Sequence, residues 1–284
     1  MFSNRGTVLY VGGFELPDKN AAAHRVLSNA KILRELGYNV VFSGVDKATS
    51  TFAKSSKIIS GFKSFPVPYP CDTKQWIKQI LSIECYSNIM DKFSDIKLVI
   101  CYNLHAVPLA RLISLCRRNN IKIIADCTEW YENRFSIKPV KLIKCMDTFF
   151  SMRILQKKCS GLIAISTYLA EYYKPSINNI IIVPPLVDLD DAKFHFRDLK
   201  RKNDVPTFVY SGSPSTSKES LGDVVKTFEN ITEINFRLII VGITGEQFSE
   251  MYGFAPKCSK IEFLGRVSHE ESLNAVRQGA RGLG

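Results

Sequence analysis

Residues 7–44 read TVLYVGGFELPDKNAAAHRVLSNAKILRELGYNVVFSG and hold the pattern that decides the fold. The first apolar run in this stretch ends at the glycine pair Gly12-Gly13. Asn20 then fits the cap of a helix, and Gly37 fits the end of that helix. A second apolar run, VVF, follows at once. Because these runs do not alternate apolar with polar residues, they predict a parallel sheet with helices on both faces.

The same alternation of strand and helix continues along the chain. Further buried strands are expected at residues 96–102, 121–126, 161–166 and 179–183. Helices are expected at residues 73–92 and 106–118, whereas residues 51–72 are basic, contain Pro and Ser, and predict a connection between elements.

The chain is expected to divide into two domains of the α/β class. Residues 1–188 predict a Rossmann-like domain with a parallel sheet. Residues 189–205 are charged and lack an apolar period, which predicts a linker. Residues 206–284 predict a second, incomplete Rossmann-like domain, in which Ser268 and Glu271 fit a capping box.

The composition excludes several classes of protein. Of the 284 residues, 45% are hydrophobic and 23% are charged, which is the balance of a folded protein. No apolar run reaches the ~18 residues that cross a bilayer, and the N-terminal residues contain no long apolar signal region. We therefore expect a cytoplasmic protein.

The spacing of the cysteines and the net charge limit the kinds of ligand and partner that the chain is expected to bind. The eight cysteines include no C-x-x-C pair, which argues against a zinc site and favours reduced, buried thiols. The net charge of +11 attracts phosphate-rich partners. The chain has no zinc-finger spacing and no arginine-rich stripe, so nucleic acid is not an expected partner, and no metal site is expected.

The first candidate site is the turn Gly12-Gly13. Two glycines after the first strand either let a ligand approach the backbone closely or only permit a tight turn. His24 and Arg25 stand near the start of the following helix and are expected to face the same ligand. His105, at the carboxyl end of another strand, is a further candidate for acceptor binding.

The second candidate site is the loop at residues 212–220, GSPSTSKES, between a strand and a helix. Backbone amides near Gly212 and Ser213, together with the helix N-terminus, suit phosphate, and Lys218 would supply positive charge. The loop departs from the Walker pattern at its second glycine and at the hydroxyl that holds magnesium, which disfavours an NTPase. It is either a looser anion-binding loop or a solvated turn.

The third candidate site, ADCTEWYE at residues 125–132, follows a buried strand. Asp126 and Glu129, beside aromatic rings, predict a sugar-binding rim, and either carboxylate could act as general base for a hydroxyl nucleophile. The same acids would also complement the dipole of a following helix.

Residues 138–159 form a basic, apolar-rich segment whose one acid is Asp147. Its apolar side chains gather broadly on one side of a helix. The segment is therefore either a membrane-surface helix or a core helix with a solvated basic face.

Taken in order, these stretches resemble the GT-B glycosyltransferases, in particular the retaining glycosyltransferase family 4. The opening stretch VLYVGGFELPDKNAAAHRVLSNAKILRELGYNVVFSG resembles the family's N-terminal signature. The stretches SGLIAISTYLAEYY and IIIVPPLVDLDD resemble a serine-ended strand and the close of the first domain. TFVYSGSPSTSKESL and FLGRVSHEESLNAV resemble parts of the donor domain.

The resemblance implies transfer of a sugar from a nucleotide-sugar to an acceptor hydroxyl, in surface polysaccharide or glycolipid biosynthesis. It implies a saccharide or lipid-linked acceptor, contact with the inner face of a membrane, and no cofactor. Lys218 fits the lysine that contacts the donor diphosphate. Many members of the family carry a histidine just after the strand that ends here at Asp126. Any role of that histidine would pass in this chain to Asp126 or Glu129.

The family's donor domain continues to an E-x7-E motif beyond the last unit matched here. The sequence is therefore expected to be a truncated member with weak or no turnover. The alternatives are a non-catalytic relative that only binds an acceptor or partner and, less favoured, a phosphate-binding NTPase.

Overall fold

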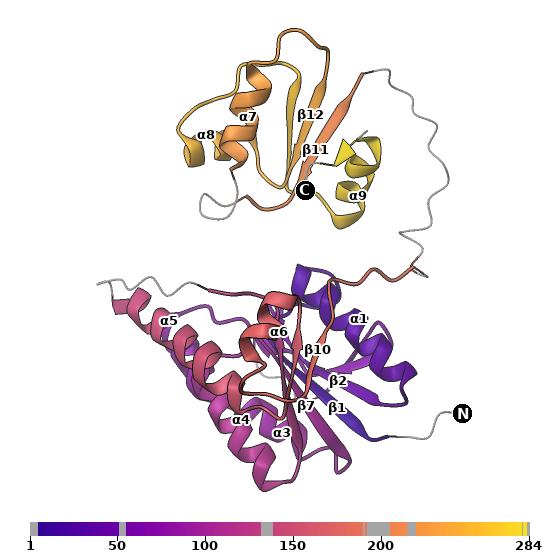
Figure 1. Ribbon diagram of the computed structural model, residues 1–284, viewed down its shortest axis with the longest axis vertical. Helices are drawn as coiled ribbons and strands as arrows, with labels where there is room; N and C mark the ends of the chain where they lie inside the picture. The colour runs from indigo at the N-terminus through magenta and orange to yellow at the C-terminus, as the bar shows by residue number, and fades with distance from the viewer. Residues whose placement is uncertain are drawn as a thin grey trace. The chain divides into compact units, whose positions relative to one another are not determined.

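A computed structural model describes residues 5–50, 55–131, 139–189, 191, 205–214, 220–279 and 281–282. The chain forms two compact units, Met1–Asp188 and Leu189–Gly284 (Figure 1). Both units are parallel α/β layers, which confirms the predicted fold class.

The first unit is built on an eight-stranded sheet. In spatial order its strands are β10 (Ile180–Ile182), β9 (Gly161–Ala164), β8 (Lys122–Cys127), β7 (Ile96–Tyr102), β1 (Thr7–Gly12), β2 (Asn39–Ser43), β5 (Phe62–Ser64) and β4 (Lys57–Ile59). All neighbours pair in parallel except β4 and β5, which are antiparallel. Two short strands, β3 (Val45–Asp46) and β6 (Val67–Pro68), form a separate pair.

Two of the sequence-based expectations for this unit were wrong. The stretch expected to be only a connection, residues 51–72, contributes β4, β5 and β6. The single helix expected at residues 73–92 is two helices, α2 (Thr73–Leu81) and α3 (Glu84–Met90), because Ser82 adopts an extended conformation.

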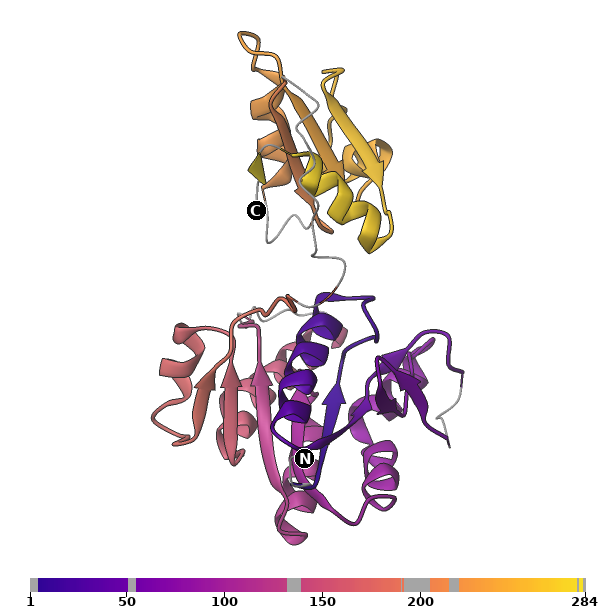
Figure 2. The same cartoon turned by 90° about the vertical axis from the view of Figure 1, so that its right-hand side faces the viewer.

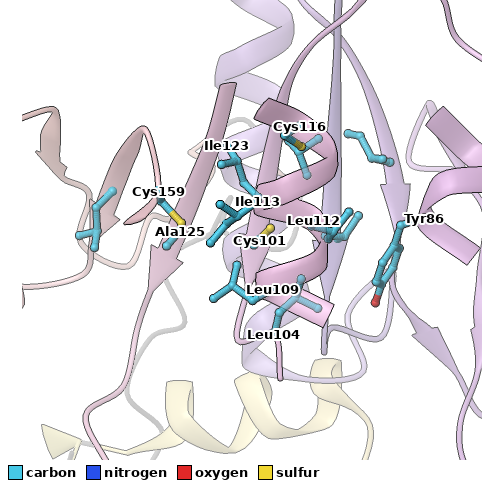
Figure 3. Packing of buried hydrophobic residues seen from close by; sticks show 14 of the residues in the cluster. Tyr86, Cys101, Leu104, Leu109, Leu112, Ile113, Cys116, Ile123, Ala125 and Cys159 are labelled. Carbon is cyan, nitrogen blue, oxygen red and sulfur yellow. The ribbon is translucent and has the colours of Figure 1, made fainter. Parts of the chain in front are cut away.

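Helices cover both faces of the first sheet (Figure 2). On one face, α1 (Ala21–Glu35) packs Ala23, Val26 and Ala30 against β1 and β2. On the other face lie α3, α4 (Ala106–Arg118) and α6 (Thr167–Tyr173). Figure 3 shows Leu112 and Cys116 of α4 in this second layer, together with Cys101 of β7. Apolar burial holds the helices of this second layer in place, whereas α1 also carries the buried polar side chains Arg25 and Asn29.

The basic segment is helical over most of its length. Helix α5 (Pro139–Phe150) continues into one π-helical turn, Ser151–Leu155, and then a 3-10 turn, Gln156–Lys158. Within the described part of the chain, no helix combines the length and the apolar character that crossing a membrane requires.

The second unit carries a four-stranded parallel sheet. Its order is β13 (Ile261–Gly265), β12 (Arg237–Val241), β11 (Thr207–Ser211) and β14 (Arg281–Gly282). The helices of this unit are α7 (Leu221–Glu229), α8 (Gly245–Tyr252) and α9 (His269–Gln278). The predicted capping box of Ser268 and Glu271 is present at the start of α9.

The backbone conformation and close packing at the end of β1 explain why residue 12 is a glycine. Gly12 has a φ of +148°, and a Cβ there would lie 2.0 Å from the backbone oxygen of Tyr102. Gly13, by contrast, is exposed, and a Cβ there would meet nothing within 4 Å. The first glycine is therefore required by packing, whereas the second leaves open space at the end of the strand.

The substitution Gly12→Ala is expected to lower the free energy of unfolding by about 1–3 kcal/mol, because it combines backbone strain with a clash. The matched control, Gly13→Ala, is expected to change it by less than about 0.5 kcal/mol. Urea unfolding of both variants checks this, and equal losses would contradict the packing argument.

Candidate functional site

The carboxyl ends of three neighbouring strands form one row in the first unit. The register pairs Gly12 of β1 with Tyr102 of β7, and Tyr102 with Asp126 of β8. The residues that follow these strands therefore emerge at one edge of the sheet, which is where open α/β sheets bind their ligands. Gly13 and Glu129 are among these residues.

Asp126 is buried and ion-paired at this edge. Its carboxylate accepts hydrogen bonds from Arg25 of α1, at 3.0 Å from Nε and 2.8 Å from Nη2. Asp126 is 0% exposed and Arg25 is 7% exposed. Arg25 also donates from Nη1 to the backbone oxygen of Val183, at 2.8 Å. The pair thus joins α1, β8 and the segment that follows β10.

Two further polar side chains complete this buried cluster. The Tyr10 hydroxyl donates to Asp126, and Asn29 Nδ2 donates to the Tyr10 hydroxyl at 3.1 Å. Burial, followed by the charge of Asp126, raises the pKa of Tyr10 well above its ordinary value, so this hydroxyl keeps its proton. Because protein groups occupy the Asp126 carboxylate, the geometry does not favour the predicted role of Asp126 as a catalytic base.

Glu129 is half-buried and lies just beyond the edge. It accepts a hydrogen bond from the hydroxyl of Tyr131, which is 44% exposed. Between them, Trp130 packs against Tyr172 and lies under the guanidinium of Arg153, 4.5 Å from the ring centroid. The aromatic rim predicted from the sequence is therefore divided: one ring packs inward, and the other stays accessible.

His105 lies at the start of α4 and pairs with an acid from α5. Its Nδ1 lies 2.7 Å from Oδ2 of Asp147, and Oδ1 of Asp147 accepts the backbone N–H of Ala106 at 2.7 Å. His105 is 43% exposed, which keeps its ring open to solvent.

An open cavity of about 350 Å³ adjoins this pair. Its walls come from α2, from the loop between β7 and α4, from Tyr131, and from α5 with the turns that follow it. They are lined by Trp76, Ile80, Asn103, Leu104, His105, Tyr131, Ile143, Lys144, Asp147, Thr148, Ser151, Met152 and Gln156. Aromatic surface beside hydroxyl, amide and charged groups suits a polar, hydroxylated ligand.

Sequence reasoning missed Asp147 and Trp76 as site residues, whereas Tyr131 belongs to the stretch 125–132 that it predicted as a sugar-binding rim. The signal for Asp147 was present, since it is the one acid in the basic stretch 138–159. A second cavity, of about 410 Å³, lies beside β6, α2 and α3, and none of its lining residues comes from the ends of β1, β7 or β8.

The remaining first-unit candidate, His24, is half-buried near the start of α1, next to Arg25. Arg25 itself is committed to Asp126 and Val183, so the predicted contact of Arg25 with a ligand is not favoured by the geometry. Among the described residues, no group of His, Cys, Asp and Glu side chains could hold a metal ion.

In the second unit, a glycine is packed as closely against a neighbouring backbone as Gly12 is in the first. A Cβ at Gly242, whose φ is +114°, would lie 1.7 Å from the backbone oxygen of Gly212. Ser213 is exposed just beyond β11. Lys218 lies outside the described residues. No side chain in the described part of the chain caps the start of α7, where residue 220 is the cap position.

Comparison with solved structures identifies the architecture. A sucrose-phosphate synthase from Thermosynechococcus elongatus superposes with a TM-score of 0.66 and 12% identity, over 98% of this chain and 75% of that one. A glycosyltransferase from Rickettsia africae superposes with a TM-score of 0.59 and 15% identity, over 96% and 71%. The chain has the GT-B fold.

The GT-B likeness extends to WaaB, a lipopolysaccharide outer core galactosyltransferase, with a TM-score of 0.55 and 12% identity over 97% of this chain and 73% of that one. No family model and no curated protein matches the sequence. The GT-B assignment therefore stands on the arrangement of strands and helices.

The buried ion pair yields a test of this edge. Asp126→Asn leaves the Arg25 charge buried without its partner, and is expected to lower the free energy of unfolding by about 3–5 kcal/mol. The control Glu171→Gln removes an exposed pair with Lys174, 71% exposed on both sides, and is expected to change stability by less than about 0.5 kcal/mol. Similar small effects in both variants would contradict the structural role of Asp126.

Proposed function

We propose that the protein transfers a sugar from a nucleotide-sugar donor to an acceptor hydroxyl. The observation that carries the proposal is the cavity beside the carboxyl edge of the first sheet, where aromatic rings and hydrogen-bonding groups converge. Such a surface suits a saccharide, because rings pack on its C–H faces while polar groups bind its hydroxyls.

On the donor side, we assign the diphosphate to the loop after β11. Gly212, Ser213 and Lys218 stand in the sequence between β11 and the start of α7, a context in which backbone amides bind phosphate. Structural neighbours support the choice of nucleotide. A trehalose-6-phosphate protein from E. coli is bound with UDP-2-fluoro glucose, and HepE from Anabaena is bound with UDP and glucose. We therefore propose a UDP-sugar.

On the acceptor side, the cavity and its rim receive the hydroxylated substrate. Tyr131 lines the cavity and donates a hydrogen bond to Glu129, whose half-buried carboxylate can also accept a hydrogen bond from a substrate hydroxyl. We assign Asp126 a positioning role only. Gly13, with open space around it, lets substrate approach the backbone at the same edge.

Helix α5 supports a membrane-associated acceptor. Leu142, Ile143, Met146, Phe149 and Phe150 are each at least 37% exposed. The exposed Lys141 and Lys144 lie on the same helix. An exposed apolar surface with basic residues matches the chemistry of an anionic lipid surface. A glycolipid or lipid-linked saccharide in surface polysaccharide assembly is therefore the acceptor class we propose.

The purified chain is expected to bind UDP-sugars more tightly than ATP in titration calorimetry, and to transfer the sugar slowly to a saccharide or glycolipid acceptor. Trp76→Ala is expected to raise the KM for acceptor about fivefold, because it removes an aromatic wall of the cavity. Tyr69→Ala, which removes an exposed ring that does not line the cavity, is the control.

Other outcomes separate the alternatives. UDP-sugar binding without transfer would favour a non-catalytic binding protein. Magnesium-dependent ATP hydrolysis without UDP-sugar binding would favour an NTPase and would contradict the proposal.

The α5 surface is tested with vesicles of phosphatidylglycerol. The double substitution Phe149→Ser and Phe150→Ser is expected to weaken co-sedimentation about tenfold, since it removes apolar surface that would enter the lipid. Met251→Ser, on a half-exposed side chain of α8, is the control. Binding of wild-type protein is expected to fall with added salt. No binding to vesicles by wild type would contradict the membrane assignment.

A further inference from the structure

We propose that the second cavity of the first unit, beside β6, α2 and α3, is a saccharide site that holds sugar units of the acceptor other than the one that reacts. The inference rests on the proposed function, because it takes the acceptor to be a saccharide, and it adds that this acceptor is a glycan of several units. The cavity has a volume of about 410 Å³, within the range of roughly 300–1,000 Å³ that is typical of small-molecule sites.

A buried tyrosine lines this cavity without a partner for its hydroxyl. Tyr86 of α3 is 7% exposed, and its ring belongs to the apolar core, at the margin of the layer that Figure 3 shows. Among the described residues, none makes a hydrogen bond with the Tyr86 hydroxyl. Burial raises the pKa of Tyr86 well above its ordinary value, so the hydroxyl keeps its proton and can donate. Because buried polar groups are normally hydrogen-bonded, this hydroxyl points to a ligand.

Three carboxamides line the same cavity. Gln75 and Gln79 come from α2, and Asn88 comes from α3. The side-chain oxygen of Gln75 accepts the backbone N–H of Cys71 at 3.1 Å, which holds this side chain in place. In the described part of the chain, no group pairs with the side chain of Gln79 or Asn88. A carboxamide both donates and accepts hydrogen bonds, so it matches the hydroxyl groups of a sugar, which do the same.

The charges and the apolar walls of the cavity favour a neutral sugar. Among the described residues that line it, Lys78 and Glu84 are charged and of opposite sign, so the cavity does not select an anion. Val67, Pro68 and Pro70 supply apolar surface that can pack on the C–H faces of a sugar ring. A hydrocarbon chain would fit these walls, but it would leave the buried hydroxyl without a partner, which costs free energy. A saccharide satisfies both kinds of surface.

Both cavities of the first unit lie at the carboxyl edge of the same sheet. The strands β3 and β6 follow directly after β2 and β5, which run parallel to β1. Helix α2 is a wall that the two cavities share: Trp76 and Ile80 line the first, and Gln75 and Gln79 line the second. These two pairs of positions lie on neighbouring sides of a helix. One extended glycan along this edge can therefore occupy both cavities.

Occupation of both cavities predicts that affinity depends on glycan length. Once one unit is bound in one cavity, the other cavity meets the next units at a high effective concentration, so longer glycans bind more tightly. A monosaccharide fills one cavity at a time and gains nothing from the other.

The test is binding of the full chain to a printed array of neutral glycans of one to eight units, without donor. Wild type is expected to bind glycans of three or more units at least about tenfold more tightly than monosaccharides. Tyr86→Phe keeps the ring in the core, and Gln79→Leu removes a half-buried carboxamide. Each is expected to weaken the binding of long glycans about threefold to tenfold. Tyr38→Phe, at a half-buried tyrosine that lines neither cavity, is the control and is expected to bind as wild type does.

Three outcomes would overturn the second saccharide site and leave donor binding untouched. The first is binding that does not depend on glycan length. The second is binding of long glycans that both cavity variants leave unchanged. The third is a fluorescent fatty acid that binds wild type and Tyr86→Phe equally while no glycan binds, which would assign the cavity to hydrocarbon.

Donor binding separates this inference from the proposed function. Both cavity variants are expected to bind UDP-glucose as wild type does in titration calorimetry. Glycan binding that both variants weaken, in a protein that neither binds a UDP-sugar nor transfers one, would overturn the proposed function while confirming the saccharide site.

Discussion

The buried ion pair between Arg25 and Asp126 determines the geometry of the first unit's binding edge. Arg25 comes from α1, Asp126 comes from the end of β8, and Val183 receives the remaining guanidinium contact. Removing two charges from water is costly, and good geometry with additional hydrogen bonds offsets that cost. Tyr10 supplies one of these bonds, and Asn29 supports Tyr10 in turn.

Under the proposed function, this pair limits where a substrate can bind. The carboxylate of Asp126 is enclosed by Arg25 and Tyr10, so Asp126 holds the sheet edge in place, and only the accessible groups beside it are left for a substrate. His105 and Glu129 follow neighbouring strands and keep contact with solvent. The edge thus combines a buried charged interior with a solvated rim, an arrangement that suits a site on a rigid scaffold.

Much of the fold could be predicted because short runs of apolar residues indicate strands that are buried on both faces. The strands β1, β2, β7, β8 and β9 are short runs covered on both faces, and such runs have few other interpretations. The strands β4, β5 and β6 were missed because each has two or three residues within a basic stretch. Pairing with the existing edge of the sheet, rather than local propensity, makes these residues extended.

The site was predicted only in part, because its contacts join residues that are distant in the chain. Asp126 was correctly placed at a strand end, but its partner lies 101 residues away, and only the folded chain shows that the carboxylate is already occupied. Likewise, His105 and Asp147 are 42 residues apart. The sequence showed Asp147 as the one acid in a basic helix, but helical periodicity could not indicate that this carboxylate would contact His105.

A double-mutant cycle between Arg25 and Asp126 tests the account most directly. The account predicts that Arg25→Met and Asp126→Asn each lower the free energy of unfolding strongly. It also predicts that the double substitution costs about 0.5–3 kcal/mol less than the sum of the two single losses, because the two side chains belong to one buried network. Additive losses would contradict the account, because the two groups would then contribute independently.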